Sequence, residues 1–118
     1  MNTHALGSEN EDIAENYLTA KGYTILERNF HVGKSGEIDI ICRDGNILVF
    51  VEVKSRRSYE YGTPEDAVTP SKRDTIRRTA QRYVHIHNAN NCECRFDVIA
   101  LDYVSGNPEI RHWVHAFD

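Results

Sequence analysis

The sequence predicts one mixed α/β domain in which a helix, three strands, a second helix and a further strand follow one another. Its 118 residues are enough for one hydrophobic core. Two β-branched runs on either side of Asp44-Gly45-Asn46 predict an antiparallel hairpin. Capping residues and helical apolar spacing occur before and after that hairpin. We therefore expect a mixed central sheet that contains the hairpin and is flanked by helices, in a single domain over residues 1–118.

The first helix is predicted to begin at a capping box formed by residues 8–11, Ser-Glu-Asn-Glu. Gly22 is well placed to end it. Apolar residues lie between at helical spacing: Ile13, Ala14, Tyr17 and Leu18. Two roles are open for Glu11: its side chain either returns to the amide of Ser8 as part of the cap, or faces the sheet.

The hairpin brings two carboxylates together. The predicted strands are residues 23–30, 36–42 and 47–54. If residues 45 and 46 form the turn, Asp39 lies directly opposite Glu52, with Cβ atoms roughly 4.5–5.5 Å apart. If the turn is residues 44 and 45, the two carboxylates are diagonal neighbours. Because side chains alternate along a strand, Glu52 and Lys54 share one face.

Opposed carboxylates in an apolar hairpin destabilise it unless they share a proton, meet cations or bind a metal. Oxygen ligands favour Mg²⁺ or Mn²⁺. Lys54 could then orient an attacking water or stabilise negative charge in the transition state. The alternative is a plain cross-strand salt bridge from Lys54 to Glu37 or Glu52, with Asp39 at a solvated end of the sheet.

The segment after the hairpin is predicted to be a long loop, residues 55–69, that mixes arginines with tyrosines. Arginine clamps phosphates and tyrosine stacks on exposed bases, which makes Arg56, Arg57 and Tyr61 candidate nucleic-acid contacts. The alternative is an ordinary polar surface loop.

A second helix is predicted to start at Thr69-Pro70, with threonine as N-cap and proline in the first turn. Its apolar stripe is Ile76, Ala80, Tyr83 and Val84. Its other faces carry five basic residues: Lys72, Arg73, Arg77, Arg78 and Arg82. Strands are predicted over residues 95–103 and, shorter, 109–115.

Basic charge is concentrated in the middle of a chain whose net charge is −4. From Lys54 to Arg82 there are eight basic and four acidic residues, so this stretch carries +4 and the remainder −8. Such a stretch favours a phosphate-facing surface, with Arg73 and Arg77 among its candidates. The alternative is that the arginines only solvate an exposed helix.

The cysteine and hydropathy patterns indicate the cellular compartment. Three cysteines imply no disulfide framework. A zinc site is open as a further alternative, although the spacing fits no standard finger; its ligands would be His85, His87, Cys92 and Cys94. No apolar run approaches the roughly 20 residues of a membrane span, and the first residues lack a signal-peptide pattern. We expect a cytoplasmic protein without membrane contact.

Asp39 followed by Glu52-Val53-Lys54 resembles the catalytic core of the PD-(D/E)XK nuclease superfamily. Longer motifs resemble the YraN family of bacterial nuclease-like proteins, and the resemblance runs over nearly the whole chain, residues 7–117. The matching strings are Gly36-Glu-Ile-Asp-Ile-Ile, Val49-Phe-Val-Glu-Val-Lys-Ser-Arg, Tyr61-Gly-Thr-Pro-Glu-Asp-Ala-Val and Arg95-Phe-Asp-Val-Ile.

The resemblance implies a restriction-endonuclease-like αβββαβ core. It implies that Asp39, Glu52 and Glu11 bind Mg²⁺ or Mn²⁺, that Lys54 is the catalytic lysine and that Lys72 contacts phosphate. Asn10 stands where the family usually has glycine.

The function implied is that of a metal-dependent nuclease acting on DNA, branched or single-stranded, in repair or recombination. By analogy with archaeal Holliday junction resolvases, a homodimer and partners among repair or recombination proteins are expected. The alternative is a non-catalytic nucleic-acid-binding module that keeps the nuclease fold.

Overall fold

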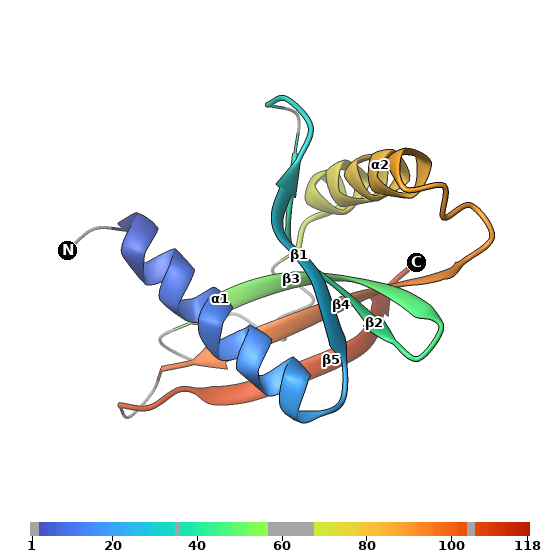
Figure 1. Ribbon diagram of the computed structural model, residues 1–118. Coiled ribbons are helices and arrows are strands. Elements are labelled where there is room, and N and C mark those ends of the chain that lie inside the picture. Colours follow the sequence, from blue (N-terminus) through green and yellow to red (C-terminus); the bar gives the residue numbers. More distant parts are fainter. Residues whose placement is uncertain (1–2, 35, 57–67, 104–105) are drawn as a thin grey trace.

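The structure, a computed structural model, describes residues 3–34, 36–56, 68–103 and 106–118 (Figure 1). Its elements are α1 (Thr3–Ala20), β1 (Thr24–His31), β2 (Glu37–Asp44), β3 (Ile47–Arg56), α2 (Pro70–Ile86), β4 (Glu93–Asp102) and β5 (Glu109–Phe117). The predicted order of helices and strands is confirmed, including the last strand, which is longer than expected. No helix in these described ranges combines the length and apolar character needed to cross a membrane.

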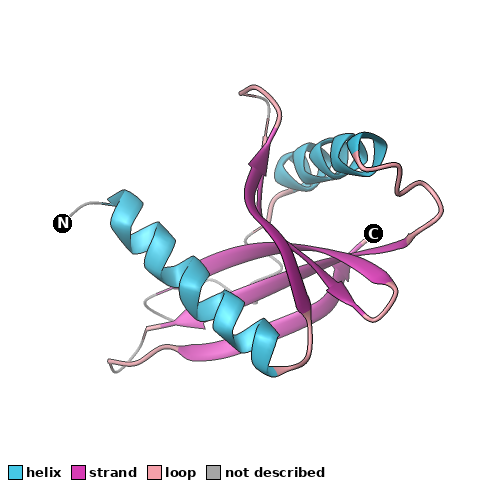
Figure 2. Cartoon of the chain, in the orientation of Figure 1, coloured by secondary structure: helices cyan, strands magenta, loops and turns pink. Residues whose placement is uncertain are grey.

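The five strands form one mixed sheet in the order β1-β2-β3-β4-β5 (Figure 2). Neighbouring strands are antiparallel except β3 and β4, which are parallel. A parallel pair needs a crossover connection, and α2 lies in that connection. The predicted mixed α/β architecture is therefore confirmed.

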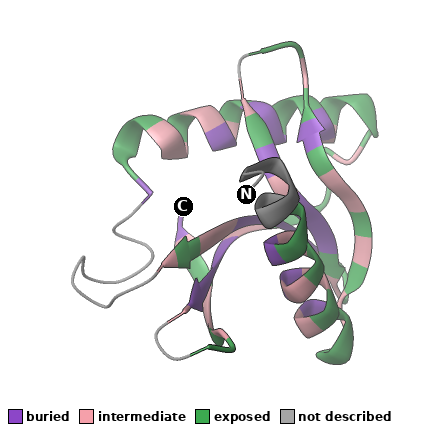
Figure 3. Ribbon diagram, turned by 90° about the vertical axis from the view of Figure 1, so that its left-hand side faces the viewer, coloured by how far each residue is buried: buried purple, intermediate pink, exposed green. Residues whose placement is uncertain are grey.

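Each helix covers a separate apolar cluster. Ala14 and Leu18 of α1 pack with one set of strand residues: Ile40, Cys42, Val49, Val51, Ile99 and Leu101. On the other face, α2 packs with Phe30, Ile38, Ile41, Leu48, Phe50, Val98 and Phe117. Figure 3 shows the buried residues along the inner sides of both helices. Since Leu48 and Phe50 belong to the α2 cluster, alternation along β3 puts Glu52 and Lys54 on the α2 face.

The two predicted helix starts have different outcomes. The Thr69 cap is confirmed: Thr69 Oγ1 accepts a hydrogen bond from Lys72 N at 3.2 Å, and Pro70 occupies the first helical position. The capping box at Ser8 is wrong, because α1 already begins at Thr3. Ser8 therefore lies inside the helix, where it cannot act as an N-cap, and the side chain of Glu11 is available for another contact.

The hairpin has the predicted register. Asp44 pairs with Ile47 across the turn, in which Gly45 has φ +61°. This left-handed conformation is one that glycine adopts readily. The β2–β3 ladder continues to the pair Ile40 and Val51, so the next step along both strands brings Asp39 opposite Glu52.

The free end of the β1–β2 pair leaves the sheet beside α2 (Figure 1). We call this part, residues 29–34 and 36–38, the arm. Ile38 packs in the α2 cluster, whereas Ile40 packs in the α1 cluster. Residues two apart share a face in a regular strand, so β2 changes face at Asp39. In the neighbouring strand β1, Asn29 has φ +53°, a left-handed conformation that bends β1 close to this point. Asp39 therefore lies at the base of the arm.

Gly36 fixes the arm against α2. A Cβ atom at this position would lie 2.5 Å from Thr75 Cγ2 and 2.6 Å from Thr79 Oγ1. Both neighbours are branched at Cβ and therefore stiff. Gly36→Ala is expected to lower the free energy of unfolding by about 1–3 kcal/mol, because the arm must move away from the helix. Chemical denaturation with constant m-value measures this change.

A rescue experiment separates this contact from a general effect of alanine. Replacing Thr75 and Thr79 by alanine removes both obstructing atoms. In that background, Gly36→Ala should cost much less stability than it does alone. An equal loss with and without the threonines would contradict the proposed contact.

Candidate active site at the base of the arm

Two carboxylates meet where β2 and β3 separate. Asp39 Oδ2 accepts a hydrogen bond from the backbone N of Val53 at 2.8 Å. The carboxylate thus takes the place of a backbone acceptor next to the last paired residues of the ladder. Glu52 is 6% exposed, and its side chain is within hydrogen-bonding reach of Asp39. The predicted juxtaposition of Asp39 and Glu52 is confirmed.

The environment disfavours two negative charges here. Burial, followed by the charge of Glu52, raises the pKa of Asp39 to about 7, against the lowering effect of the Val53 hydrogen bond. Burial also raises the pKa of Glu52, although the charges of Lys72 and Lys54 act in the opposite direction. The pair therefore favours a shared proton at neutral pH, and a cation placed between the carboxylates would relieve the repulsion.

Two lysines approach the same oxygen of Glu52. Lys54 Nζ lies 3.7 Å and Lys72 Nζ 3.6 Å from Glu52 Oε1. Lys54 comes from the same strand as Glu52, whereas Lys72 comes from the first turn of α2. The cap at Thr69 holds this turn by its bond to the backbone of Lys72. The sequence predicts a lysine beside the carboxylates, but nothing in it places Lys72 next to Glu52.

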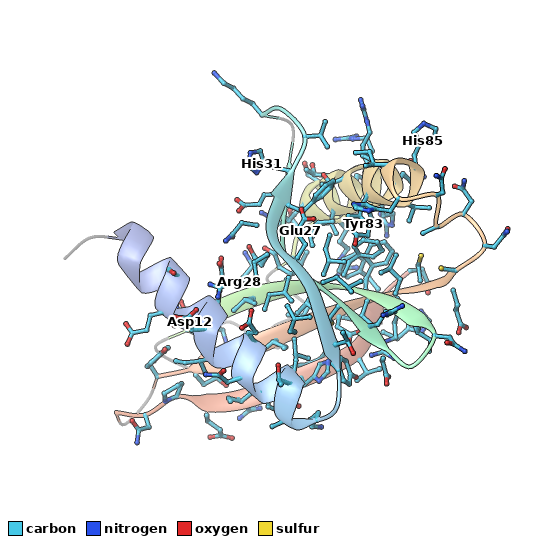
Figure 4. All side chains as sticks on the ribbon, in the orientation of Figure 1. Asp12, Glu27, Arg28, His31, Tyr83 and His85 are labelled. Atoms are coloured by element: carbon cyan, nitrogen blue, oxygen red, sulfur yellow. The ribbon has the colours of Figure 1, made fainter. Side chains whose placement is uncertain are left out.

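Glu11 forms an ion pair with Arg28. Its Oε1 lies 3.4 Å from Arg28 of β1, which also contacts Asp12 at 2.6 Å and Glu15 at 3.7 Å. Figure 4 shows Arg28 and Asp12 on facing elements, β1 and α1. The charge of Glu11 is nevertheless a minor cause of the raised pKa of Asp39, so Glu11 is close to the site without joining the carboxylate pair. Arg28 was not a residue that the sequence motifs singled out.

The donor set fits a hard divalent cation that also takes ligands from its substrate. Among the described residues, no three His, Cys, Asp or Glu side chains are gathered closely enough to hold an ion. Mg²⁺ is commonly bound through only one or two carboxylates, with waters and substrate phosphates completing its octahedron. Asp39 and Glu52 supply that number of carboxylates, and all their ligand atoms are oxygens, as Mg²⁺ and Mn²⁺ prefer.

The predicted nucleic-acid contacts Arg56, Arg73 and Arg77, which the structure describes, are engaged with partners inside the protein. Arg56 pairs with buried Asp102, its Nε 2.8 Å from Oδ1, and its own side chain is only 9% exposed. Arg73 donates to the carbonyl of Val68, and Arg77 pairs with Asp74 at 2.8 Å. The guanidinium groups of Arg73 and Arg77 both lie over the ring of Phe117. Arg57 and Tyr61 lie outside the described residues, as does most of the predicted loop.

The proposed zinc ligands do not form a group either. Cys92 and Cys94 are exposed, as are His85 and His87. In the part of the chain that the structure describes, these four side chains are not brought together as a metal site.

A buried polar network that the motifs do not indicate lies on the α1 side of the sheet. Asp97 is fully buried at its side chain and contacts Arg95 Nε at 2.9 Å and His112 Nε2 at 2.7 Å. Burial would raise the pKa of Asp97, but the hydrogen bonds from His112 and Arg95 lower it. His112 Nδ1 lies 3.2 Å from the hydroxyl of Tyr17, which ties α1 to β4 and β5.

Fold and site together define a mixed α/β domain with a carboxylate pair, buried Glu52 and partly buried Asp39, and two lysines at the open end of a hairpin. A model of the Uncharacterised protein family UPF0102 matches residues 10–101. The chain belongs to this family, which is the one that the YraN resemblance indicated.

Relatives in the same family cover nearly all of the chain. A UPF0102 protein of Caldicellulosiruptor saccharolyticus is 46% identical over 101 residues, covering 86% of this chain and 85% of that protein. One from Geobacter metallireducens is 42% identical over 118 residues, with coverage of 100% and 96%. Another, from Rhodococcus opacus, is 44% identical over 114 residues, with 96% of both chains covered.

Proposed function

We propose that this protein is a metal-dependent nuclease that hydrolyses phosphodiester bonds of DNA, with a restriction-endonuclease-like core of the PD-(D/E)XK superfamily. The single observation that carries the proposal is the convergence of Asp39, Glu52, Lys54 and Lys72 at one point. Opposed acids that lower stability are expected where a protein uses them for binding or catalysis.

Each residue has a distinct part in the proposed reaction. Asp39 and Glu52 would hold Mg²⁺ or Mn²⁺, which supplies Lewis-acid polarisation of the scissile phosphate and lowers the pKa of a bound water. Lys54 positions the attacking water or stabilises charge on the phosphoryl oxygens. Lys72, at the start of α2, contacts a non-bridging oxygen of the same phosphate.

The electrostatics support this assignment. Two lysines alone leave Glu52 with a raised pKa and Asp39 with a pKa of about 7, so the lysines do not fully compensate the carboxylates. A divalent cation between the acids would compensate both. It would also free the ammonium groups, now within 4 Å of Glu52, to meet phosphate oxygens.

The test is an assay with Mg²⁺, Mn²⁺ or EDTA on duplex, single-stranded, flapped and four-way-junction DNA, scoring cleavage and gel retardation together. Glu52→Gln is run alongside to exclude a contaminating nuclease, and Glu93→Gln, an exposed glutamate of β4, is the matched control. We expect metal-dependent cleavage that only Glu52→Gln abolishes. Retardation without cleavage under every condition would favour the non-catalytic binding module instead.

A further inference from the structure

The basic residues of α2 fall into two groups. Arg73 and Arg77 face the C-terminal strand and contact Phe117, Val68 and Asp74. Arg78 and Arg82 are exposed and line a hollow of about 180 Å³ next to the arm, together with Val32 and Thr79. The second group therefore lies next to the arm, and its side chains are more exposed than those of Arg73 and Arg77.

Arg78 and Arg82 carry charge that the described residues do not neutralise. Within the described side chains, no carboxylate lies within 4.0 Å of either guanidinium, and the hydrogen bond of Arg78 is a long one, 3.4 Å to Thr75 Oγ1. The two arginines are four apart, so their like charges stack on one side of the helix and repel. An anionic ligand would offset this repulsion.

From this arrangement we infer that Arg78 and Arg82, with the adjoining side of the arm, form a second phosphate-contacting surface for a nucleic-acid strand. The inference rests on the proposed nuclease function and adds to it a surface that binds the substrate at a distance from the scissile phosphate. Arginine suits this role because its planar guanidinium binds two phosphate oxygens at once.

Helix geometry sets the distance between this surface and the candidate active site. Lys72 contacts Glu52, and Arg78 and Arg82 follow six and ten residues later on the same helix. At 1.5 Å per residue, they lie about 9 and 15 Å further along the axis. Each residue also turns the helix by about 100°, so the two arginines project roughly 80–120° around the axis from Lys72, and a strand that contacts both surfaces must span at least about three nucleotides at about 3.4 Å each.

The arm lies between the two points of contact. Gly36 sits against α2 at Thr75 and Thr79, which are between Lys72 and Arg82 in the helix. A strand bound at both ends of this helix therefore passes the arm, whose position depends on that glycine.

The test measures binding separately from cleavage. Fluorescent single-stranded and duplex oligonucleotides are titrated with protein that carries Glu52→Gln, in EDTA and at several NaCl concentrations. The double variant Arg78→Gln/Arg82→Gln is expected to bind at least about tenfold more weakly. The slope of log affinity against log salt should fall by about 1.4 for single strands and about 1.8 for duplexes. The control is Arg43→Gln, which removes one positive charge from an exposed position of β2.

The outcomes distinguish this inference from the proposed function. If the wild type cleaves DNA and the double variant binds with the same slope as Arg43→Gln, the arginine surface is wrong and the nuclease stands. If the double variant loses binding but the wild type cleaves nothing, the surface stands and the nuclease is wrong. If neither oligonucleotide binds the Glu52→Gln protein at low salt, the surface is overturned.

Discussion

Asp39→Asn is expected to abolish metal-dependent cleavage while making the metal-free protein more stable at pH 8. The variant removes one of the two carboxylates proposed to bind the metal, so we expect cleavage to fall by at least about 10²–10³-fold. Its amide oxygen can still accept the hydrogen bond that Val53 N gives to Asp39, and its NH₂ group can donate to Glu52. The repulsion between the two acids is thus replaced by a neutral hydrogen bond.

The pH dependence follows from the raised pKa. The pKa of Asp39 is about 7 in the folded protein and about 3.9 in an unfolded chain. Between these values the folded state binds a proton that the unfolded state does not, so stability falls as pH rises through this window. The penalty is complete above pH 7. A difference of about three pKa units corresponds to about 4 kcal/mol, so we expect Asp39→Asn to gain up to about 4 kcal/mol at pH 8, or roughly 10–20 °C in Tm, and almost nothing at pH 4.

Calorimetry or thermal denaturation in EDTA measures this difference at both pH values. Glu93→Gln is the control, because Glu93 is an exposed acid of β4 and is not among the charges that raise the pKa of Asp39. Adding Mn²⁺ at pH 8 should raise the Tm of the wild type but not that of Asp39→Asn. A variant that is less stable than the wild type at pH 8 in EDTA, or that keeps full cleavage, would contradict the assigned role of Asp39.

Local signals in the sequence were sufficient for most of the fold. The Gly45-Asn46 turn sets the hairpin register, and with it the meeting of Asp39 and Glu52, because pairing from a tight turn fixes every later pair. Thr69 and Pro70 define the start of α2 by contacts within one turn. The same kind of reasoning was wrong at Ser8, because a capping box is also an ordinary helical sequence when the residues before it continue the helix.

Contacts between distant segments could not be predicted in this way. Lys72 reaches Glu52 only because α2 crosses over the sheet, and Arg28 engages Glu11 only because β1 bends beside α1. Arg56 follows Lys54 closely in the sequence, yet its guanidinium pairs with Asp102, 46 residues away. Charge counts could not separate arginines paired with carboxylates, such as Arg56 and Arg77, from Arg78 and Arg82.

The two lysines at Glu52 are expected to differ in kinetic effect, although their distances are nearly equal. Lys54 is two residues from Glu52 on one strand, so its position relative to the carboxylates is fixed by the backbone. Its side chain is 31% exposed, whereas that of Lys72 is 43% exposed and comes from another element. We therefore expect Lys54→Met to lower kcat by about 10²–10³-fold with KM nearly unchanged, since it removes stabilisation made only in the transition state.

Lys72→Met should instead raise KM about tenfold with a smaller loss of kcat, because a phosphate contact acts in the bound substrate as well as in the transition state. Methionine keeps the length of the side chain without its charge, and Lys21→Met, an exposed lysine after α1, is the control. Neither variant should weaken Mn²⁺ binding, because each removes a cation that competes for Glu52. Equal losses of kcat in both variants would mean that the two ammonium groups act as one unit, and full activity of Lys54→Met would transfer the catalytic role to Lys72.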